Sequence, residues 1–213
     1  MEKSKVYFIK EITSENLIKI YETLGVQLKG KVAVKLSSGE PGGHHFLNPN
    51  LIKDLVHKVN GTIIECNTAY GGKRDKTEDH WKAIKDHGFI DIATVDIMDE
   101  EGDMPIPVEN GFHLKEDYVG THLKNYDSIL VLSHFKGHAM GGFGGALKNI
   151  SIGIGSSKGK LWIHSAGKSM NQAEVWNNLP EQDDFLESMA DASEAVINYM
   201  GKENMVYISI ANN

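Results

Sequence analysis

The segment of residues 128–160 begins with a short apolar run and continues directly into a polar loop that is rich in glycine. Residues 129–132, with the sequence ILVL, include β-branched side chains and are typical of a strand buried on both faces of a parallel sheet. In an open α/β sheet, ligands sit beyond the carboxyl ends of the strands, where loop backbone and helix N-termini converge. We therefore expect the functional site in the loop that follows residue 132.

Patterns typical of strands and helices alternate along the chain up to this loop. We expect buried strands at residues 31–36, 62–66 and 92–97. Thr13 or Ser14 caps a first helix before these strands, and Asn48, followed by Pro49, caps a second between the first two of them. This alternation predicts an α/β fold of three layers, in which helices cover both faces of a mostly parallel sheet. The length predicts one α/β domain over residues 1–213.

Other segments carry weaker patterns. We expect a strand at residues 6–9, a helix capped by Thr77, a pair of short strands within residues 105–114, helices at residues 118–126 and 183–199, and a strand at residues 205–210. Residues 150–154 form either a strand or the end of a helix. The acidic segment 99–103 is most simply a solvated turn. Residues 156–160 form a second polar turn, which either contacts a phosphate group or is a plain surface loop.

Composition excludes several classes of protein. The net charge is −7 and the chain contains one arginine, which argues against nucleic acid as a partner, since phosphate contacts need clustered lysine and arginine. No apolar run approaches the roughly 18 residues that span a membrane, and the N-terminus lacks the apolar region of a signal peptide. With Cys66 as the single cysteine there is no intrachain disulfide, and the expected location is the cytoplasm.

Two histidines and two lysines lie in or beside the central loop. Imidazole nitrogens bind metals or carry protons near neutral pH, and lysine ammonium groups hold anions. We expect Lys136, His138 and Lys148 to be catalytic, and His134 and His138 to be metal ligands. The alternative for both histidines is hydrogen bonding to backbone or water, because the intervening glycine argues against helical HxxxH spacing.

The glycines of this loop, with the asparagine after it, form a candidate cofactor site. The residues are Gly141, Gly142, Gly144, Gly145 and Asn149. Glycine lets the backbone approach an anion closely and turn its N–H groups inward. The spacing matches neither a Walker A loop nor GxGxxG, so a mobile lid and a tight turn remain as alternatives.

A second glycine-rich loop, residues 37–45, follows the strand expected at residues 31–36 and ends in His44 and His45. We expect these histidines to be further metal ligands, with a surface loop as the alternative. If the strand ends meet at one edge of the sheet, the site is lined by His44, His45, Asn67, Tyr70, His134, Lys136, His138, Lys148 and Asn149.

Three parts of the sequence carry a resemblance to a known family. They are HFKGHAMGGFGGALKN at residues 134–149, GKLWIHS at residues 159–165, and the strand at residues 31–36 with GGHH at residues 42–45. Together they resemble the DUF362 proteins, often described as uncharacterised iron–sulfur-centre proteins. Many members carry a ferredoxin-type insertion with four-cysteine motifs after the matching His-Ser. This chain has one cysteine, so a conventional [4Fe-4S] cluster is not expected within it.

The resemblance also implies that the chain is a fragment or a short form, because family proteins usually continue beyond the segment that matches residues 206–210. For function, we expect a metal- or cofactor-dependent enzyme or redox protein that acts on a small anionic molecule, with a divalent metal ion as one candidate cofactor. The alternative is a non-catalytic carrier of metal or of an iron–sulfur precursor. A metal-cofactor isomerase, by analogy with lactate-racemase-like proteins, is a third hypothesis.

Overall fold

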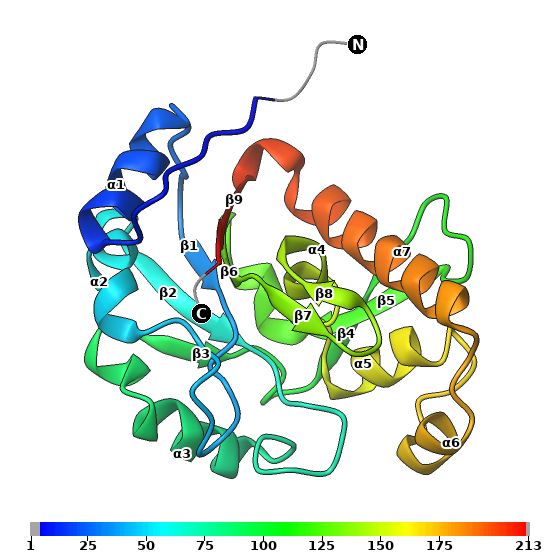
Figure 1. Ribbon diagram of the computed structural model, residues 1–213. Coiled ribbons are helices and arrows are strands. Elements are labelled where there is room, and N and C mark those ends of the chain that lie inside the picture. Colours follow the sequence, from blue (N-terminus) through cyan, green and yellow to red (C-terminus); the bar gives the residue numbers. More distant parts are fainter. Residues whose placement is uncertain (1–4, 212–213) are drawn as a thin grey trace.

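The computed structural model describes residues 5–211, and a five-stranded parallel sheet lies at its centre (Figure 1). In chain order the strands are β1 (Val32–Lys35), β2 (Gly61–Glu65), β3 (Val95–Ile97), β6 (Ser128–His134) and β9 (Met205–Ile210). They are arranged β3-β2-β1-β6-β9, and every neighbouring pair is parallel. The strands expected at residues 31–36, 62–66, 129–132 and 205–210 are confirmed, whereas β3 is shorter than the run of residues 92–97.

Helices cover both faces of this sheet (Figure 1). One face carries α1 (Ser14–Thr23), α2 (Pro49–Lys58) and α3 (Thr77–Asp86), and the other carries α4 (Ala146–Ile150), α5 (Ser157–His164) and α7 (Gln182–Met200), with α6 (Gln172–Asn177) beside α5. Strand side chains alternate between the two cores: Val34 and Leu132 pack with the first group, and Ala33 and Val131 with the second. The predicted three-layer α/β architecture is confirmed.

The helix caps follow the sequence at α1 and α2 but not at α3. The Thr13 hydroxyl accepts a hydrogen bond from the N–H of Asn16, and Asn48 Oδ1 accepts one from the N–H of Asn50. At α3 the cap position is Lys76, without a side-chain bond, so the prediction that Thr77 caps this helix is wrong. The Thr77 hydroxyl instead accepts a hydrogen bond from Asn67, because a neighbouring loop approaches it.

Two antiparallel pairs of short strands lie outside the main sheet. The first joins β4 (Asp103–Pro107) to β5 (Glu116–Gly120), and the second joins β7 (Lys136–His138) to β8 (Gly142–Gly144). The helix expected at residues 118–126 is therefore wrong. That segment is the end of β5 followed by the 3-10 helix η2 (Thr121–Asn125), because pairing with β4 overrides the local helical pattern. Two further 3-10 turns are η1 (Phe89–Asp91) and η3 (Lys202–Asn204).

The expected strand at residues 6–9 is also wrong. These residues pair with neither edge strand, and Val6 and Phe8 are 89% and 88% exposed. A strand pattern gives a strand only where a neighbour supplies hydrogen bonds, and this segment has none in the described part of the chain.

The segments left open by the sequence belong to the helices around the central loop. Residues 146–150 form α4 and residues 151–154 form turns, so the alternative of a strand at residues 150–154 is wrong. Residues 157–160 begin helix α5 and Lys160 is buried, so this segment is not a surface loop. The helix expected at residues 183–199 is confirmed as α7 and ends at Gly201, whose φ of 79° favours glycine. No helix in residues 5–211 is long and apolar enough to cross a membrane.

Asp191, on α7, holds the connection between β4 and β5. Its carboxylate accepts backbone hydrogen bonds from Phe112 at 3.0 Å, His113 at 2.8 Å and Leu114 at 3.0 Å, and the residue is 3% exposed. Each buried donor that loses its partner costs about 1–3 kcal/mol. The Asp191 side chain therefore fixes the β4–β5 connection to helix α7.

We expect Asp191→Ala to lower the free energy of unfolding by about 3 kcal/mol, because the backbone donors around it lose their acceptor. Urea denaturation followed by circular dichroism measures the change. Glu194→Ala, at an exposed position of the same helix, is the control and is expected to change stability by less than about 0.5 kcal/mol. Equal losses in both variants would contradict this role of Asp191.

Candidate functional site

A cavity of about 480 Å³ opens at the carboxyl edge of the central sheet. From β1 the chain continues to β2 and β3 on one side, and the later strands β6 and β9 lie on the other, so the strand order reverses between β1 and β6. Loops diverge at such a point and leave a crevice between them. The polar side chains that line the cavity are Lys35, Ser37, Glu40, His45, Glu65, Thr68, Tyr70, Arg74, Ser133, His134, Lys136, His138, Lys148, Asn149, Lys160 and His164.

Glu65, the last residue of β2, is the centre of a buried charge network. It is 4% exposed, and its carboxylate accepts hydrogen bonds from Lys35 Nζ at 2.8 Å and from the N–H and hydroxyl of Ser38 at 2.7 and 3.0 Å. Arg74 Nη1 lies 3.4 Å from the same carboxylate. Burial alone would raise the pKa of Glu65, but Lys35 and Arg74 outweigh burial and hold this pKa at about 2.

Arg74 extends the network to the rim of the cavity. Its second guanidinium nitrogen forms an ion pair with Glu40, which also accepts a hydrogen bond from the Tyr70 hydroxyl at 2.9 Å. Behind these groups lies His80, fully buried, with its ring nitrogens at Asn67 and Ser38. Burial lowers the pKa of His80 to about 4, so this histidine is neutral and supports the side chains of Asn67 and Ser38.

Three lysines at the cavity have no acidic partner among the described residues. Lys160 is buried and donates a hydrogen bond from Nζ to the carbonyl of Gly155 at 2.6 Å, while Lys136 and Lys148 make neither an ion pair nor a hydrogen bond with any described side chain. Burial and the neighbouring cations lower the pKa of Lys148 to about 8. The cavity thus holds five cationic side chains against the two carboxylates Glu40 and Glu65.

Two histidines of the cavity are fixed in opposite tautomers by the backbone. The N–H of Gly141 donates to His138 Nδ1 at 3.0 Å, so a neutral His138 carries its proton on Nε2. His164 Nδ1 donates to the carbonyl of Lys160 at 2.6 Å, which leaves Nε2 of His164 as an acceptor. Burial lowers both pKa values, that of His164 to about 4, with Lys148 contributing in each case. His138 is thus a hydrogen-bond donor and His164 a proton acceptor at neutral pH.

Packing holds the ring of His164 in place. It stacks on Phe185, with ring centroids 4.9 Å apart, and meets the edge of Trp176 at 5.1 Å. Trp176 lines the same cavity. The imidazole of His164 is therefore held by a backbone hydrogen bond and by two aromatic rings.

Asn149 fastens the two strands that flank the cavity. Its side-chain nitrogen lies within hydrogen-bonding distance of the carbonyls of Lys35 and Leu132, at 3.2 and 3.1 Å, and of the Ser133 hydroxyl at 3.1 Å. The following turn passes so close that a Cβ at Gly153 would lie 2.8 Å from Lys35 Cε. Asn149 lines the cavity, as predicted for a cofactor-binding residue, but its donor nitrogen is committed to the protein's own backbone.

The predicted glycines divide between two places. Gly144 and Gly145 line the cavity, whereas Gly141 and Gly142 lie at the tip of the β7–β8 hairpin outside the lining. The central loop is therefore a hairpin, and its contribution at Gly141 is the N–H that fixes His138. Binding of a cofactor by these glycines stays a prediction.

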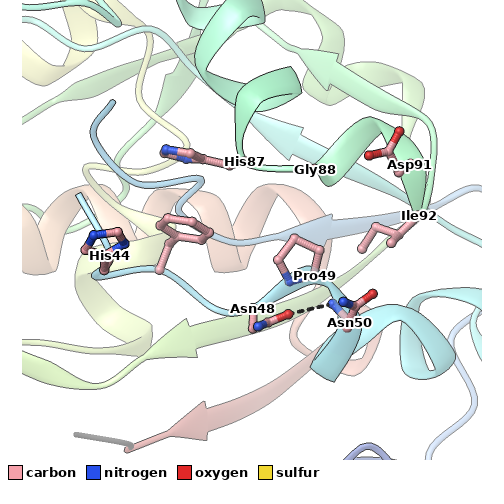
Figure 2. Close-up of a pocket in the computed structure, with 9 residues that line it drawn as sticks. His44, Asn48, Pro49, Asn50, His87, Gly88, Asp91 and Ile92 are labelled. Carbon is pink, nitrogen blue, oxygen red and sulfur yellow. Dashed lines mark hydrogen bonds between the residues drawn. The ribbon is translucent and has the colours of Figure 1, made fainter. Parts of the chain in front are cut away.

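The structure separates the four histidines predicted as metal ligands. His45, His134 and His138 line the main cavity. His44 instead lines a second depression of about 460 Å³ near His87 and Asp91 (Figure 2). Phe46 of the same lining stacks on His87, with ring centroids 4.2 Å apart. Within residues 5–211, these four do not bring three ligand atoms within 4.8 Å of one another, and metal binding by them stays a prediction. Asn67, also expected in the lining, lies buried behind it.

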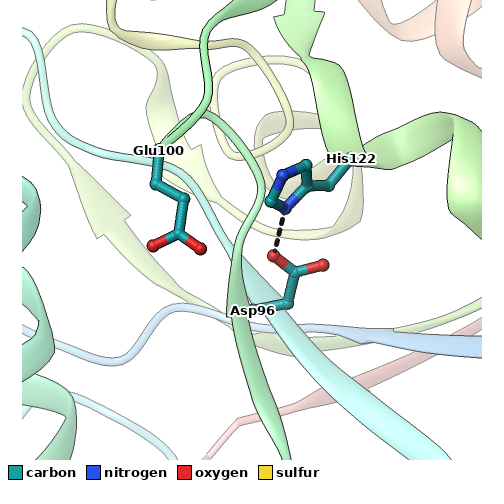
Figure 3. A group of neighbouring side chains, drawn as sticks. All are labelled: Asp96, Glu100 and His122. Carbon is teal, nitrogen blue, oxygen red and sulfur yellow. Dashed lines mark hydrogen bonds and ion pairs between the residues drawn. The ribbon is translucent and has the colours of Figure 1, made fainter.

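Metal-capable side chains do gather at two other places. They are Asp96, Glu100 and His122 (Figure 3), and His113, Asp184 and Glu187. At the first, His122 Nδ1 lies 2.7 Å from Asp96 and Nε2 lies 3.2 Å from Glu101, and these carboxylates raise the pKa of His122 against the opposing effect of burial. Ion pairs with Asp96 and Glu101 therefore explain the position of His122, because each ring nitrogen has a carboxylate partner.

The single cysteine does not fit an iron–sulfur centre. Cys66 is buried, its thiol donates to the carbonyl of Ile154 at 3.3 Å, and burial raises its pKa far above the usual range. A [4Fe-4S] cluster requires four ligands, normally thiolates. Cys66 is thus a small buried residue of the core.

Sequence reasoning missed the buried part of the site. Lys35 and Glu65 each end a strand directly after two apolar residues. A charged residue at the end of a buried strand is the signal that could have found them. Arg74 is the only arginine of the chain. Asp99, expected in a solvated turn, instead accepts hydrogen bonds from the N–H groups of Asn67 and Ser157 and joins two loops behind the cavity.

A solved structure shares this fold. The lactate racemase apoprotein from Thermoanaerobacterium thermosaccharolyticum matches over 95% of this chain and 50% of its own, with a TM-score of 0.56 and 15% identity. A protein from Thermotoga maritima matches over 94% of this chain and 50% of its own, with a TM-score of 0.48 and 16% identity. The chain thus spans half the length of each of these structures. No curated protein sequence matches it.

A family model matches residues 32–213, which include every residue that lines the main cavity. The model is described as "Domain of unknown function (DUF362)", and the match covers most of the 213 residues. The resemblance seen in the sequence is therefore confirmed, and the chain belongs to the DUF362 family.

Proposed function

We propose that this protein is an enzyme that binds a small carboxylate or phosphate anion in the main cavity and catalyses proton transfer on it. The observation that carries the proposal is the charge of the cavity, where five cationic side chains face two carboxylates. Both carboxylates are already paired with Arg74, and Glu65 also with Lys35. The cations left over, Lys136, Lys148 and Lys160, attract an anion from solution.

The two histidines supply the proton chemistry. His164 accepts a proton at Nε2, and its aromatic neighbours hold it in place. His138 donates from Nε2 and stabilises negative charge that develops on a substrate oxygen, as the nearby lysines also do. Both rings line the same cavity, and His138 contributes to the lowered pKa of His164, so the two lie within electrostatic range of each other.

The fold comparison is compatible with this substrate class. The structure with the shared fold is named a lactate racemase apoprotein, and lactate is a small carboxylate. The identity is 15% and the match covers half of that chain, so the likeness supports the fold alone. The substrate class proposed for this protein is inferred from its own cavity.

A metal or iron–sulfur carrier is the second candidate. Its support is the two groups of histidine and carboxylate side chains outside the cavity that could hold a metal ion. Three unpaired lysines, however, repel a cation from the main cavity, and the single cysteine gives no thiolate set for a cluster. The anion-binding enzyme therefore accounts for more of the structure.

We expect Lys136→Gln to weaken binding of inorganic phosphate or lactate about fivefold, because an exposed ammonium group contributes roughly 1 kcal/mol to an anion at the cavity mouth. Isothermal titration calorimetry at low ionic strength measures this change. Lys82→Gln removes a lysine of α3 that pairs with Asp86 outside the cavity, and is expected to leave the affinity unchanged. Anion affinity that is the same in all three proteins would contradict the proposed site.

We expect His164→Phe to slow proton exchange on the substrate by about 10²- to 10⁴-fold, because the phenyl ring keeps the stacking on Phe185 but removes the base. Proton NMR of lactate and related small carboxylates in D₂O follows loss of the C–H signal next to the carboxylate. His44→Ala, in the second depression, is the control and is expected to retain the wild-type rate. Exchange that persists in His164→Phe would exclude His164 as the base.

The exchange rate is also expected to stay level as the pH decreases from 7 to 5. The pKa of His164, about 4, keeps the base neutral over this range. A histidine of ordinary pKa, about 6.5, would lose more than about tenfold of its base form by pH 5. A steep fall of the rate below pH 6.5 would show that another group is the base.

A further inference from the structure

Lys148 differs from the other lysines of the cavity in having an amine that is both uncommitted among the described residues and carried by a half-buried side chain. Lys35 forms an ion pair with Glu65, and Lys160 donates to the carbonyl of Gly155. Lys136 is exposed at the mouth. We propose that Lys148 is a nucleophile that forms an imine with the oxo group of a 2-oxo carboxylate bound in the cavity. This inference rests on the proposed function and names its substrate class.

The position of Lys148 is fixed although its amine is free. It lies on α4 directly before Asn149, which is tied to the ends of β1 and β6, and Ser151 donates to the carbonyl of Leu147 on the same helix. The lysine stem passes Gly144, where an added Cβ would lie 3.9 Å from Lys148 Cδ. Among residues 5–211, no hydrogen bond or ion pair holds the Nζ atom, which is therefore available to a ligand in the cavity.

The surroundings favour the neutral amine, which is the reactive form. Burial lowers the pKa of Lys148 to about 8, and the neighbouring cations act in the same direction. An ordinary lysine, with a pKa of about 10.4, is less than about 0.1% neutral at pH 7, whereas a pKa of 8 leaves roughly a tenth neutral. The charged and titratable groups that act on Lys148 or respond to it are Lys35, Arg74, Lys136, His138, Lys160 and His164.

The same cations that lower this pKa also select the substrate. Lys136, Lys148 and Lys160 line the same cavity, so we place the carboxylate between Lys136 and Lys160 and the adjacent carbon at Lys148. For a nucleophilic amine to react there, that carbon must carry an oxo group. A 2-oxo carboxylate is the smallest anion with this arrangement, and it is well within a cavity of about 480 Å³.

The step balances without an oxidant or a reductant. The Nζ lone pair forms a bond to the carbonyl carbon, the C–O bond breaks, and the oxygen leaves as water with the two hydrogens of the amine. His164 Nε2 accepts a proton from nitrogen and returns it to oxygen, while His138 donates a hydrogen bond from Nε2 to that oxygen. The product is a neutral imine that joins Lys148 to the carbon next to the carboxylate.

The test uses pyruvate with sodium borohydride, which reduces an imine to a stable secondary amine. Intact mass spectrometry counts the adducts and peptide mapping locates them, while calorimetry measures pyruvate binding in the same samples. The variants are Lys148→Arg, which keeps the positive charge but cannot form an imine, and Lys82→Arg, which changes an exposed lysine outside the cavity. We expect one adduct at Lys148 in the wild type and in Lys82→Arg, and at least about tenfold less in Lys148→Arg.

The outcomes separate the two proposals. Pyruvate that binds but is not trapped, or is trapped evenly over exposed lysines, overturns the imine and leaves the anion site standing. Pyruvate that does not bind while phosphate does overturns the 2-oxo carboxylate class. Failure of both anions to bind overturns the proposed function itself. If Lys148→Arg is unfolded by circular dichroism, the peptide map of the wild type still decides which lysine reacts.

Discussion

The buried carboxylate of Glu65 is the interaction on which the functional edge of this protein depends. It lies at the end of β2 and holds Lys35 from β1, Arg74 from the loop after β2, and Ser38 from the loop after β1. A charge this deeply buried is stable only when opposite charges and donors surround it, and here they come from different loops. The network therefore fixes the loops around the cavity in one arrangement and leaves the remaining lysines unpaired.

Backbone contacts then decide what the unpaired groups can do. The N–H of Gly141 makes His138 a donor at Nε2, and the carbonyl of Lys160 makes His164 an acceptor. The same residue type thus takes two opposite roles within one cavity. Cations close together lower the pKa of Lys148, so the excess positive charge that attracts an anion also keeps an amine partly neutral. In the proposed function, binding and reactivity therefore have the same physical source.

Many residues that line the cavity could be predicted one by one from the sequence. Lys136, His138 and Lys148 follow the β6 strand and do line the cavity, because the carboxyl end of a central strand is where a crevice forms. His44 and His45 are neighbours in sequence but point to different cavities, which no spacing rule predicts. Lys35, Glu65 and Arg74 were missed because their roles come from mutual contact, and contact between distant loops depends on the strand order.

The sequence by itself determined the alternation of strands and helices, the caps of α1 and α2, and the segment after β6 that lines the main cavity. These features depend on local periodicity and local hydrogen bonding. Only the tertiary structure decided that residues 118–126 are a strand end and a 3-10 helix, that residues 6–9 remain unpaired, and which histidine donates and which accepts. These features depend on which distant segment packs beside each of these residues. The physical reason is that hydrogen bonds and ion pairs between segments stabilise the fold by more free energy than the local conformational preferences that they override.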